Sequence, residues 1–537
     1  MIGFNIRKSV RKYFFRASED KPSADGKPCS DGTEFSAQAE SRKFTGDVIW
    51  FAIAQLFVSI VLGVVTLPAL TKSYEPLVYG IWIQMNVTVD FISPLLSLQL
   101  GLSAVRFLAG EENTEKRRRA LGAMLSATTL IVLFVSAAGI VFSRQLSSFL
   151  FNSPEYVTYI DFLVLWVAFN SVFNFLQSYL RARSRIKEIS IIQIILTVLK
   201  VVAILVLATR AATIGNIFAA MVTLQVLFTA ITLAIIIRET GFPLPRLRGL
   251  GTYLSYGLPQ TPVVILLWAI TLSDRYFITK FVGLSETAVY SSSAMLAGLV
   301  ALFYSPISLA LLPQLSRLSA QNRKSDAGKY FESSIKLFLT LAVPAAIGVA
   351  IISQPLLQIL TTSDFLAGRE VVFLLALGGV FLGLYQLNIN PILVDHRSKW
   401  LPLVTSTAYL TSVALNFVLV PRMGILGAAI SNCVSFLVIA VVTTVWVKNA
   451  IPFSLNLSYL GKVAAAAGAM LLSLTFFKVD TFLQMIFAAF VGSAVFGVGL
   501  VFLGGISLKD GRNICRTFGE VLKSLSEFKP KDEEKGA

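Results

Sequence analysis

The sequence is poor in charged residues and in the residue types that build most catalytic and metal sites. Only 14% of its 537 residues are Asp, Glu, Lys or Arg, whereas soluble globular proteins carry about 25%. A single histidine, His396, argues against a histidine-based metal site. The three cysteines, Cys29, Cys433 and Cys515, are widely spaced and form neither a zinc pattern nor a disulfide framework.

Motifs for several kinds of chemistry are also missing. No G-x-x-x-x-G-K-[ST] segment occurs, which excludes ATP hydrolysis by a phosphate-binding loop of that type. We find no cluster of acidic residues or histidines at one membrane face of the kind that an integral-membrane glycosyltransferase would need. The first 46 residues have no apolar core of signal-peptide type, so we expect no cleaved leader.

Long apolar runs dominate the rest of the chain, and 55% of all residues are hydrophobic. Runs of roughly 20 residues match the length of a helix that spans a bilayer. We therefore predict an all-α polytopic membrane protein of about fourteen transmembrane helices. The expected helices cover 47–70, 81–105, 120–142, 157–180, 189–209, 213–237, 252–280, 286–312, 333–353, 371–394, 400–420, 424–447, 458–478 and 482–504.

The basic residues indicate the orientation of these helices. The net charge is +16, and the 46 Lys and Arg residues gather in short segments between apolar runs. Alternating helices from a cytoplasmic N-terminus place most of them on the cytoplasmic side, as the positive-inside rule requires. This pattern favours a membrane protein over a nucleic-acid-binding one, with both termini in the cytoplasm. Residues 1–16 are basic and partly apolar, which fits either an amphipathic helix on an anionic leaflet or a solvated tail.

An internal repeat is visible at an offset of about 210 residues. Lys280 follows Lys72 by 208 residues, and Arg422 follows Arg210 by 212. Six predicted helices separate the copies, so the two halves have the same topology and are related by an axis along the membrane normal. Pro94 and Pro306, inside the second and eighth helices, are also 212 residues apart. Matched interruptions of this kind point to a transport cavity, and we predict hinges there, although prolines are also tolerated in membrane helices.

Charged residues within the apolar runs are the candidate site residues, because charges in the hydrocarbon usually face a cavity. Lys200, Arg275 and Arg106 are predicted to contact an anionic cargo; a structural ion pair or an interfacial anchor is the alternative for each. Asp90 and Asp274 are predicted to bind a coupling ion or to form structural hydrogen bonds. Asp274 is also counted among the cavity residues, and no other cofactor is expected.

Three segments resemble bacterial polysaccharide flippases. The stretch from Pro259 to Leu296, PQTPVVILLWAITLSDRYFITKFVGLSETAVYSSSAML, resembles their seventh and eighth helices, including the Asp274-Arg275 pair. GILGAAIS, residues 424–431, resembles the start of their twelfth helix, and residues 67–80 resemble their first hairpin. The chain thus resembles the O-antigen and exopolysaccharide flippases of the MOP superfamily, kin to MATE exporters, over about residues 45–505.

The resemblance implies a domain organisation and a function. It implies an N-lobe (47–240), a C-lobe (250–448) and two further helices (456–505) between cytoplasmic tails (1–46 and 506–537), with the lobes around a V-shaped cavity. It implies alternating-access transport of an undecaprenyl-diphosphate-linked oligosaccharide across the inner membrane, coupled to H⁺ or Na⁺. Membrane lipids, a polysaccharide polymerase and a chain-length regulator are the implied partners. A MATE-type drug or cation antiporter and a lipid II flippase remain as alternatives.

Overall fold

The structure is a computed structural model that describes residues 57–505, apart from 59, 60, 62, 64, 211, 244, 246, 248, 396–400, 454–456 and 478–480. The predicted tails, 1–46 and 506–537, and His396 lie outside the described residues.

Helices make up the regular structure of the described residues, with no strand among them. A helix ends at Thr71, and it is followed by α3 (Pro76–Leu96), α4 (Leu100–Leu108), α5 (Thr114–Val141), α6 (Ser143–Phe151), α7 (Val157–Ala182), α8 (Ile186–Thr209), α9 (Ile214–Thr240), α10 (Leu250–Gly257), α11 (Thr261–Phe281), α12 (Leu284–Ala297), α13 (Tyr304–Ala320), α14 (Lys324–Leu360), α15 (Arg369–Val394), α16 (Leu401–Val447), α17 (Leu457–Thr475) and α18 (Phe482–Phe502). Helices suit a lipid environment because they satisfy every backbone polar group within one segment.

The helix lengths agree with the predicted membrane protein. Among the described residues, 10 helices are long and apolar enough to cross a bilayer, or up to 12 if α3 with α4 and α10 with α11 each form one bent span. α16 has 47 residues and breaks at Gly424, where φ is 58°, so it has room for two spans. With the helix that ends at Thr71, this arrangement is consistent with fourteen spans.

The internal repeat reappears in the helix bounds. α15 occupies residues 369–394 and α7 occupies 157–182, so the two helices have equal length and begin 212 residues apart. The break at Gly424 corresponds to position 212, which lies in the connection between α8 and α9. The two copies therefore repeat the same helical hairpins.

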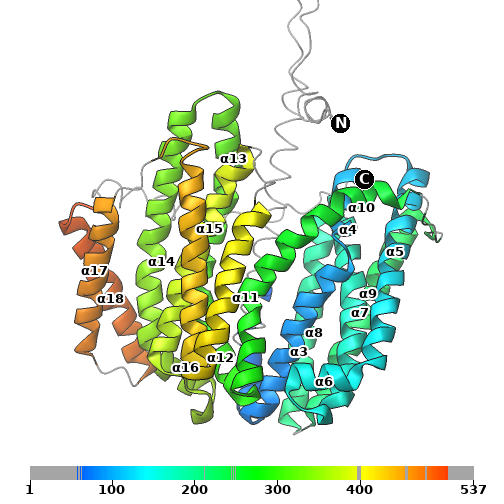
Figure 1. Cartoon of the computed structure of the whole chain (residues 1–537), viewed down its shortest axis with the longest axis horizontal. Coiled ribbons are helices and arrows are strands. Elements are labelled where there is room, and N and C mark those ends of the chain that lie inside the picture. Colours follow the sequence, from blue (N-terminus) through cyan, green and yellow to red (C-terminus); the bar gives the residue numbers. More distant parts are fainter. Residues whose placement is uncertain are drawn as a thin grey trace, which may run out of the picture. The chain divides into compact units, whose positions relative to one another are not determined.

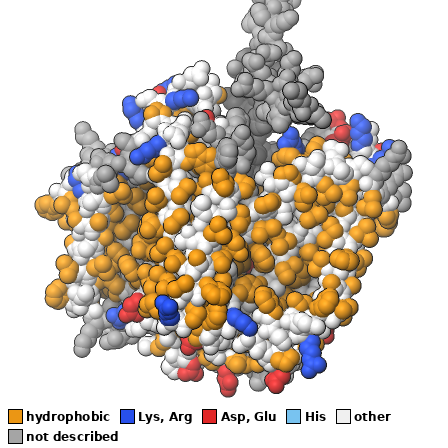
Figure 2. All heavy atoms as spheres, viewed as in Figure 1, with side chains coloured by type: hydrophobic (Ala, Val, Ile, Leu, Met, Phe, Trp, Pro, Cys, Tyr) orange, Lys and Arg blue, Asp and Glu red, His pale blue; other side chains and the backbone are white. Residues whose placement is uncertain are grey.

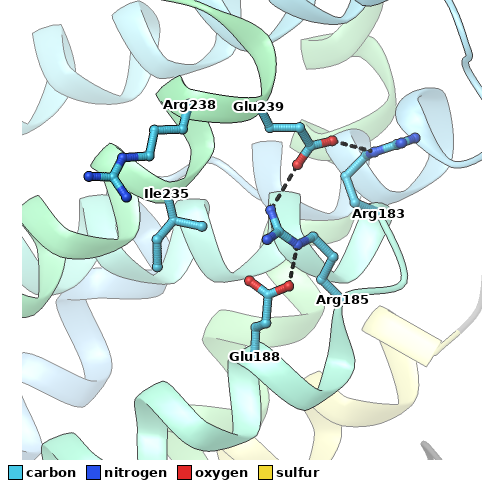
Figure 3. Close-up of a pocket in the computed structure, with 6 residues that line it drawn as sticks. All are labelled: Arg183, Arg185, Glu188, Ile235, Arg238 and Glu239. Carbon is cyan, nitrogen blue, oxygen red and sulfur yellow. Dashed lines mark hydrogen bonds and ion pairs between the residues drawn. The ribbon is translucent and has the colours of Figure 1, made fainter. Parts of the chain in front are cut away.

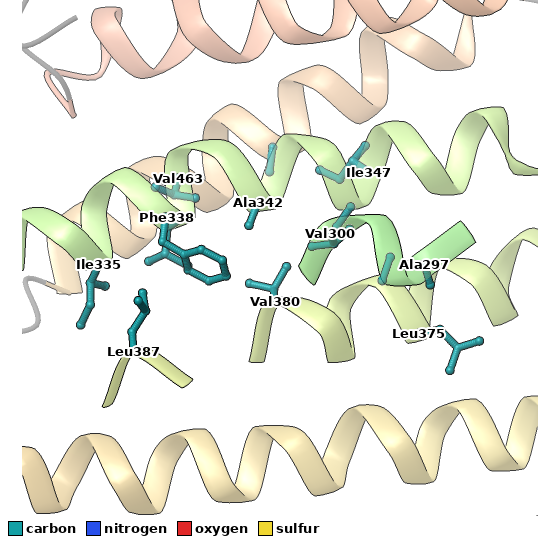
Figure 4. Close-up of a cluster of buried hydrophobic side chains, with 14 of the residues drawn as sticks. Ala297, Val300, Ile335, Phe338, Ala342, Ile347, Leu375, Val380, Leu387 and Val463 are labelled. Atoms are coloured by element: carbon teal, nitrogen blue, oxygen red, sulfur yellow. The ribbon is translucent and has the colours of Figure 1, made fainter. Parts of the chain in front are cut away.

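Figure 1 shows helices α3–α9 grouped in an N-lobe and α12–α16 grouped in a C-lobe, with α11 between them. α17 and α18 pack on the outer side of α14. The C-lobe core is formed by closely packed apolar side chains, shown in Figure 4. There the ring of Phe338 lies against Gly383, where an added Cβ would be only 2.2 Å from the ring. Small residues allow such close approach, which is the main source of helix association within a bilayer.

On the face seen in Figure 2, apolar side chains cover much of the surface of both lobes. Phe134 on α5 and Phe490 on α18 expose 76% and 73% of their surface, respectively. Such a continuous apolar surface matches the lipid-facing side of a multi-pass membrane protein.

The two ends of the helices differ. One end carries Arg117–Arg119, Arg183 and Arg185, and we call it the basic end. The opposite end holds α6 and the α11–α12 turn, and we call it the far end.

Two bent spans meet through their bends. Between α3 and α4, Leu98 and Gln99 adopt φ of 44° and 54°, a left-handed conformation that is costly for side chains of this size. Gly257, at the end of α10, packs against this bend, and a Cβ there would lie 2.8 Å from the Leu98 carbonyl oxygen. Strained backbone of this kind is concentrated at functional sites.

Candidate functional site

A polar cavity lies beside the bend between α3 and α4. Its volume is about 580 Å³, and its lining comes from α3, α4, α7 and Trp268 of α11. The lining residues are Asp90, Pro94, Ser97, Gln99, Gly101, Leu102, Asn170, Asn174, Phe175, Ser178, Arg181 and Trp268. Polar groups facing a cavity at membrane depth mark substrate pathways.

The α7 side of the cavity is a polar stripe formed by Asn170, Asn174, Ser178 and Arg181. Their spacing of four, four and three residues places all of them on one helix face. Asn170 is held by α3, because its Nδ2 donates to Ser93 Oγ at 3.1 Å. The sequence prediction missed this stripe because it considered mainly charged residues; the helical spacing of two asparagines ahead of Arg181 was the available signal.

Asp90 and Pro94 face this stripe from α3, one helical turn apart. Asp90 lies far from both ends of its span, yet its side chain is exposed. The exposed carboxylate therefore faces the cavity that Asp90 lines. It also has a direct electrostatic interaction with Lys200. Among the site residues that the sequence predicted, Asp90 and Pro94 are the two in the lining of this cavity.

Lys200 lies inside the N-lobe rather than in the cavity lining. Its Nζ donates to Gln225 Oε1 of α9 at 3.0 Å and lies 5.8 Å from the centre of the Trp166 ring of α7. α8 therefore contributes a cation that is held between α7 and α9. Through its interaction with Asp90, this cation still adds to the electrostatic field of the cavity.

Asp274 lies in the interior of the C-lobe, with none of its surface exposed. Its carboxylate accepts hydrogen bonds from Tyr290 Oη at 2.8 Å, Asn416 Nδ2 at 2.8 Å and Asn432 Nδ2 at 2.9 Å. α11, α12 and both halves of α16 thus converge on one carboxylate. Three neutral donors stabilise its anionic form, since a buried charge needs hydrogen-bonding partners.

Arg275 has its own contacts beside Asp274, with which it also interacts electrostatically. Its Nη1 donates to the Thr271 carbonyl oxygen at 2.8 Å, and its guanidinium lies 5.3 Å from the centre of the Tyr290 ring. Arg106 is exposed at the basic end, where its guanidinium lies 4.2 Å from the centre of the Tyr256 ring of α10. The predicted cations Lys200, Arg275 and Arg106 therefore occupy three separate places.

Each of the two matched prolines lies near an interruption of its span. Pro94 comes before the interruption in the chain, and Pro306 comes after it. Pro94 lies three residues before the bend at residues 97–99, and α3 and α4 differ in direction by 49°. Pro306 lies three residues after the 3-10 segment Gly298–Phe303 that links α12 to α13. Both spans are thus interrupted near the proline that the repeat singled out.

A second, apolar cavity of about 320 Å³ adjoins the first, since Trp268 lines both. Side chains from α3, α5, α6 and α7 of the N-lobe and from α11 and α16 of the C-lobe surround it. A polar and an apolar space therefore lie next to each other between the lobes.

The lobes touch on both sides of these cavities. At the far end, Gly80 of α3 lies against Leu284, and Tyr79 packs edge-on against Phe365 at 5.6 Å. About two helical turns farther along α3, Thr88 Oγ1 lies 3.0 Å from Tyr276 Oη. At the basic end, α4 contacts α10, where Ser103 Oγ donates to the Tyr253 carbonyl oxygen at 2.8 Å. The two lobes are therefore in contact at both ends of the helices.

A third pocket, of about 610 Å³, opens at the basic end between α7, α8 and α9 (Figure 3). Glu239 pairs there with Arg183 at 3.3 Å and with Arg185 at 2.9 Å. Within the described residues, no group of three or more His, Cys, Asp or Glu side chains is placed to hold a metal ion.

Comparisons with known proteins give a consistent picture. Residues 111–370 match the family described as "Polysaccharide biosynthesis protein". The "Probable low-salt glycan biosynthesis flippase Agl15" of Haloferax volcanii is 21% identical over 227 residues, which are 42% of this chain and 48% of the relative. The chain spans about half the length of the curated relatives it matches.

Solved structures share the fold over most of the chain. "Lipid II flippase MurJ, inward closed conformation" has a TM-score of 0.71 and 16% identity, covering 84% of this chain and 98% of that structure. An inward-facing "multidrug resistance MATE family transporter of the MOP superfamily" has a TM-score of 0.58 and 14% identity, covering 74% and 97%. At these identities the likeness establishes the fold alone, which is MurJ-like and MATE-like.

Proposed function

Because residues 111–370 match the polysaccharide biosynthesis family and the chain has the fold of MurJ and of MATE transporters, we propose that it is a flippase for a lipid-linked oligosaccharide. The cargo is an undecaprenyl-diphosphate-linked repeat unit of an O-antigen or exopolysaccharide. The observation that carries this proposal is the polar cavity between α3 and α7, which adjoins an apolar cavity.

The cavity has the groups that such a headgroup needs. Sugar hydroxyls both donate and accept hydrogen bonds, and the side chains of Asn170, Asn174 and Ser178 offer both kinds of partner. Arg181, at the basic end of the same stripe, supplies a planar cation for a phosphate. The lipid tail stays in the bilayer, where no polar group has to be displaced.

Transport requires the two ends to open in turn. In the basic-end-open state, α10 leaves α4 and the contact between Arg106 and Tyr256 is broken. In the far-end-open state, the contact between Gly80 and Leu284 separates. The bends next to Pro94 and Pro306 are the hinges of this movement.

Ion coupling is assigned to Asp274, with Asp90 as a second acid that faces the cargo. Asn416 Oδ1 is buried and has no hydrogen-bond partner within the part of the chain that the structure describes. Rotating the amides of Asn416 and Asn432 by half a turn would replace two donors around Asp274 with two oxygen acceptors. A carboxylate with amide oxygens is a ligand set for a hard cation such as Na⁺, whereas H⁺ needs only the carboxylate.

The protein would act in the inner membrane with both tails in the cytoplasm, so the basic end faces the cytoplasm. A polysaccharide polymerase and a chain-length regulator would use the product on the other side. Lipid II transport is the second candidate, favoured by the likeness to MurJ over 84% of the chain. A cation antiporter is favoured by Asp90 and by the likeness to a MATE transporter, but Arg181 in the same cavity repels cations.

Transport in defined vesicles tests the proposal. The purified protein is reconstituted with a polyprenyl-diphosphate oligosaccharide labelled on its sugar, and access of an added sugar-modifying enzyme is followed with and without H⁺ or Na⁺ gradients. We expect transfer by the native protein and at least a tenfold slower rate for Arg181→Gln, whereas Arg144→Gln at the far end should transfer normally. Transfer of lipid II alone would favour the second candidate. Failure with every glycan lipid, together with export of a cationic dye, would refute the proposal.

A further inference from the structure

The pocket at the basic end of α7, α8 and α9 has an excess of positive charge. Arg183, Arg185 and Arg238 line it together with Glu188 and Glu239 (Figure 3). Glu239 holds two of the arginines and Glu188 pairs with Arg185, whereas no ion pair or hydrogen bond of the Arg238 guanidinium is found among the described residues.

The paired arginines also keep unused donors. A guanidinium has five N–H groups, but Arg183 uses only Nε in its pair with Glu239, and Arg185 uses Nε and Nη1. Glu239 therefore orders both guanidiniums without saturating them. Arg117, only 7% exposed, adds a further cation nearby, since it interacts electrostatically with Tyr179, as do Arg183 and Arg185.

From the pocket toward the far end, α8 and α9 present exposed apolar side chains on the same helix faces that carry the charged residues of the pocket. On α8, Ile191 and Ile195 follow Glu188 by three and seven residues and expose 49% and 47% of their surface. On α9, Ile231 precedes Arg238 by seven residues and is also exposed. Residues at these spacings share a helix face, so a cationic pocket sits above an apolar surface formed by two adjacent helices.

We propose that this pocket binds the headgroup of an anionic bilayer phospholipid, whose acyl chains lie along the exposed faces of α8 and α9. The phosphate accepts hydrogen bonds from Arg238 and from the unused donors of Arg183 and Arg185. This site lies on the outer side of the N-lobe, separate from the polar cavity, and it is independent of the cargo that the protein carries.

Lipid binding to the purified full-length protein tests the proposal. Phosphatidylglycerol and phosphatidylcholine are titrated in mixed micelles, and bound lipid is counted by native mass spectrometry. We expect selective retention of phosphatidylglycerol, and Arg238→Gln should weaken it about five- to tenfold, since each arginine near an anionic headgroup contributes about that factor. Arg144→Gln, which makes the same charge change at the far end, should leave it unaltered.

Glu188→Gln is expected to change phosphatidylglycerol binding in the opposite direction from Arg238→Gln. It removes a negative charge from the pocket and should tighten phosphatidylglycerol binding, whereas a purely structural ion-pair role predicts only a lower Tm. Equal retention of the two lipids by the native protein would overturn the proposal. So would equal effects of Arg238→Gln and Arg144→Gln, or preferential retention of a polyprenyl diphosphate over phosphatidylglycerol. None of these results depends on transport.

Discussion

Gly80→Ala should open the far end of the protein. The added Cβ would lie 2.2 Å from the Leu284 carbonyl oxygen and 2.8 Å from its carbon, whereas ordinary contacts are at least 3.4 Å long. Backbone atoms of two lobes meet there, so the overlap has to be relieved by separating α3 from the start of α12. Overpacking of this kind costs about 1–3 kcal/mol, which favours the far-end-open state by about 5- to 150-fold.

Labelling of a buried cysteine measures this shift. Thr88 is 1% exposed and lies just inside the far-end contact. In a background without the native cysteines, Thr88→Cys is labelled by a membrane-impermeant maleimide added on the far-end side. Where the open state closes faster than it is labelled, the rate should rise by the same factor as the population of the open state.

Gly215→Ala is the matched control, since it lies near the far end of α9 and its new Cβ would meet only atoms 3.8 Å and 3.9 Å away. Both variants have to retain their thermal stability for the comparison to hold. Equal labelling rates in the two folded variants would refute the view that the contact between Gly80 and Leu284 closes the far end.

Three further changes test other parts of the structure. Gly424→Ala should lower the Tm, because φ of 58° and ψ of −135° cost a residue with a Cβ about 1–3 kcal/mol. Gly461→Ala, which adds a Cβ in open space on α17, should leave the Tm unchanged. Equal Tm values for the two variants would contradict this interpretation of the break at Gly424. Asp274→Asn should remove the dependence of transport on an ion gradient while transport down a cargo gradient continues, and a retained gradient effect would exclude Asp274 as the coupling site. Lys200→Met should slow transport at least tenfold because Asp90 loses its cationic neighbour; unchanged transport would assign Lys200 a purely structural role.

Local properties of the sequence determined the fold class. Apolar runs of bilayer length predict helices without knowledge of their neighbours, since lipid leaves the backbone no other way to satisfy its polar groups. The repeat could also be detected in the sequence, because paired positions such as Arg210 and Arg422 keep one offset. α7 and α15, which have equal lengths, begin at the same offset. Asp90 and Pro94 stood out in the sequence, as a candidate for ion coupling and a candidate hinge, because a charge and a proline are both costly within an apolar helix; the structure places both in the lining of the polar cavity.

Tertiary packing decided which polar groups meet. Asp274 and Arg275 are adjacent in sequence, yet the carboxylate accepts hydrogen bonds from Asn416 and Asn432 of α16, whereas the guanidinium bonds to the Thr271 carbonyl oxygen of its own helix. Lys200 bonds to Gln225 inside the N-lobe instead of lining the polar cavity. The direction of a side chain depends on how each helix rotates against its neighbours, and in lipid that rotation is set by close packing across distant segments rather than by hydropathy along one helix.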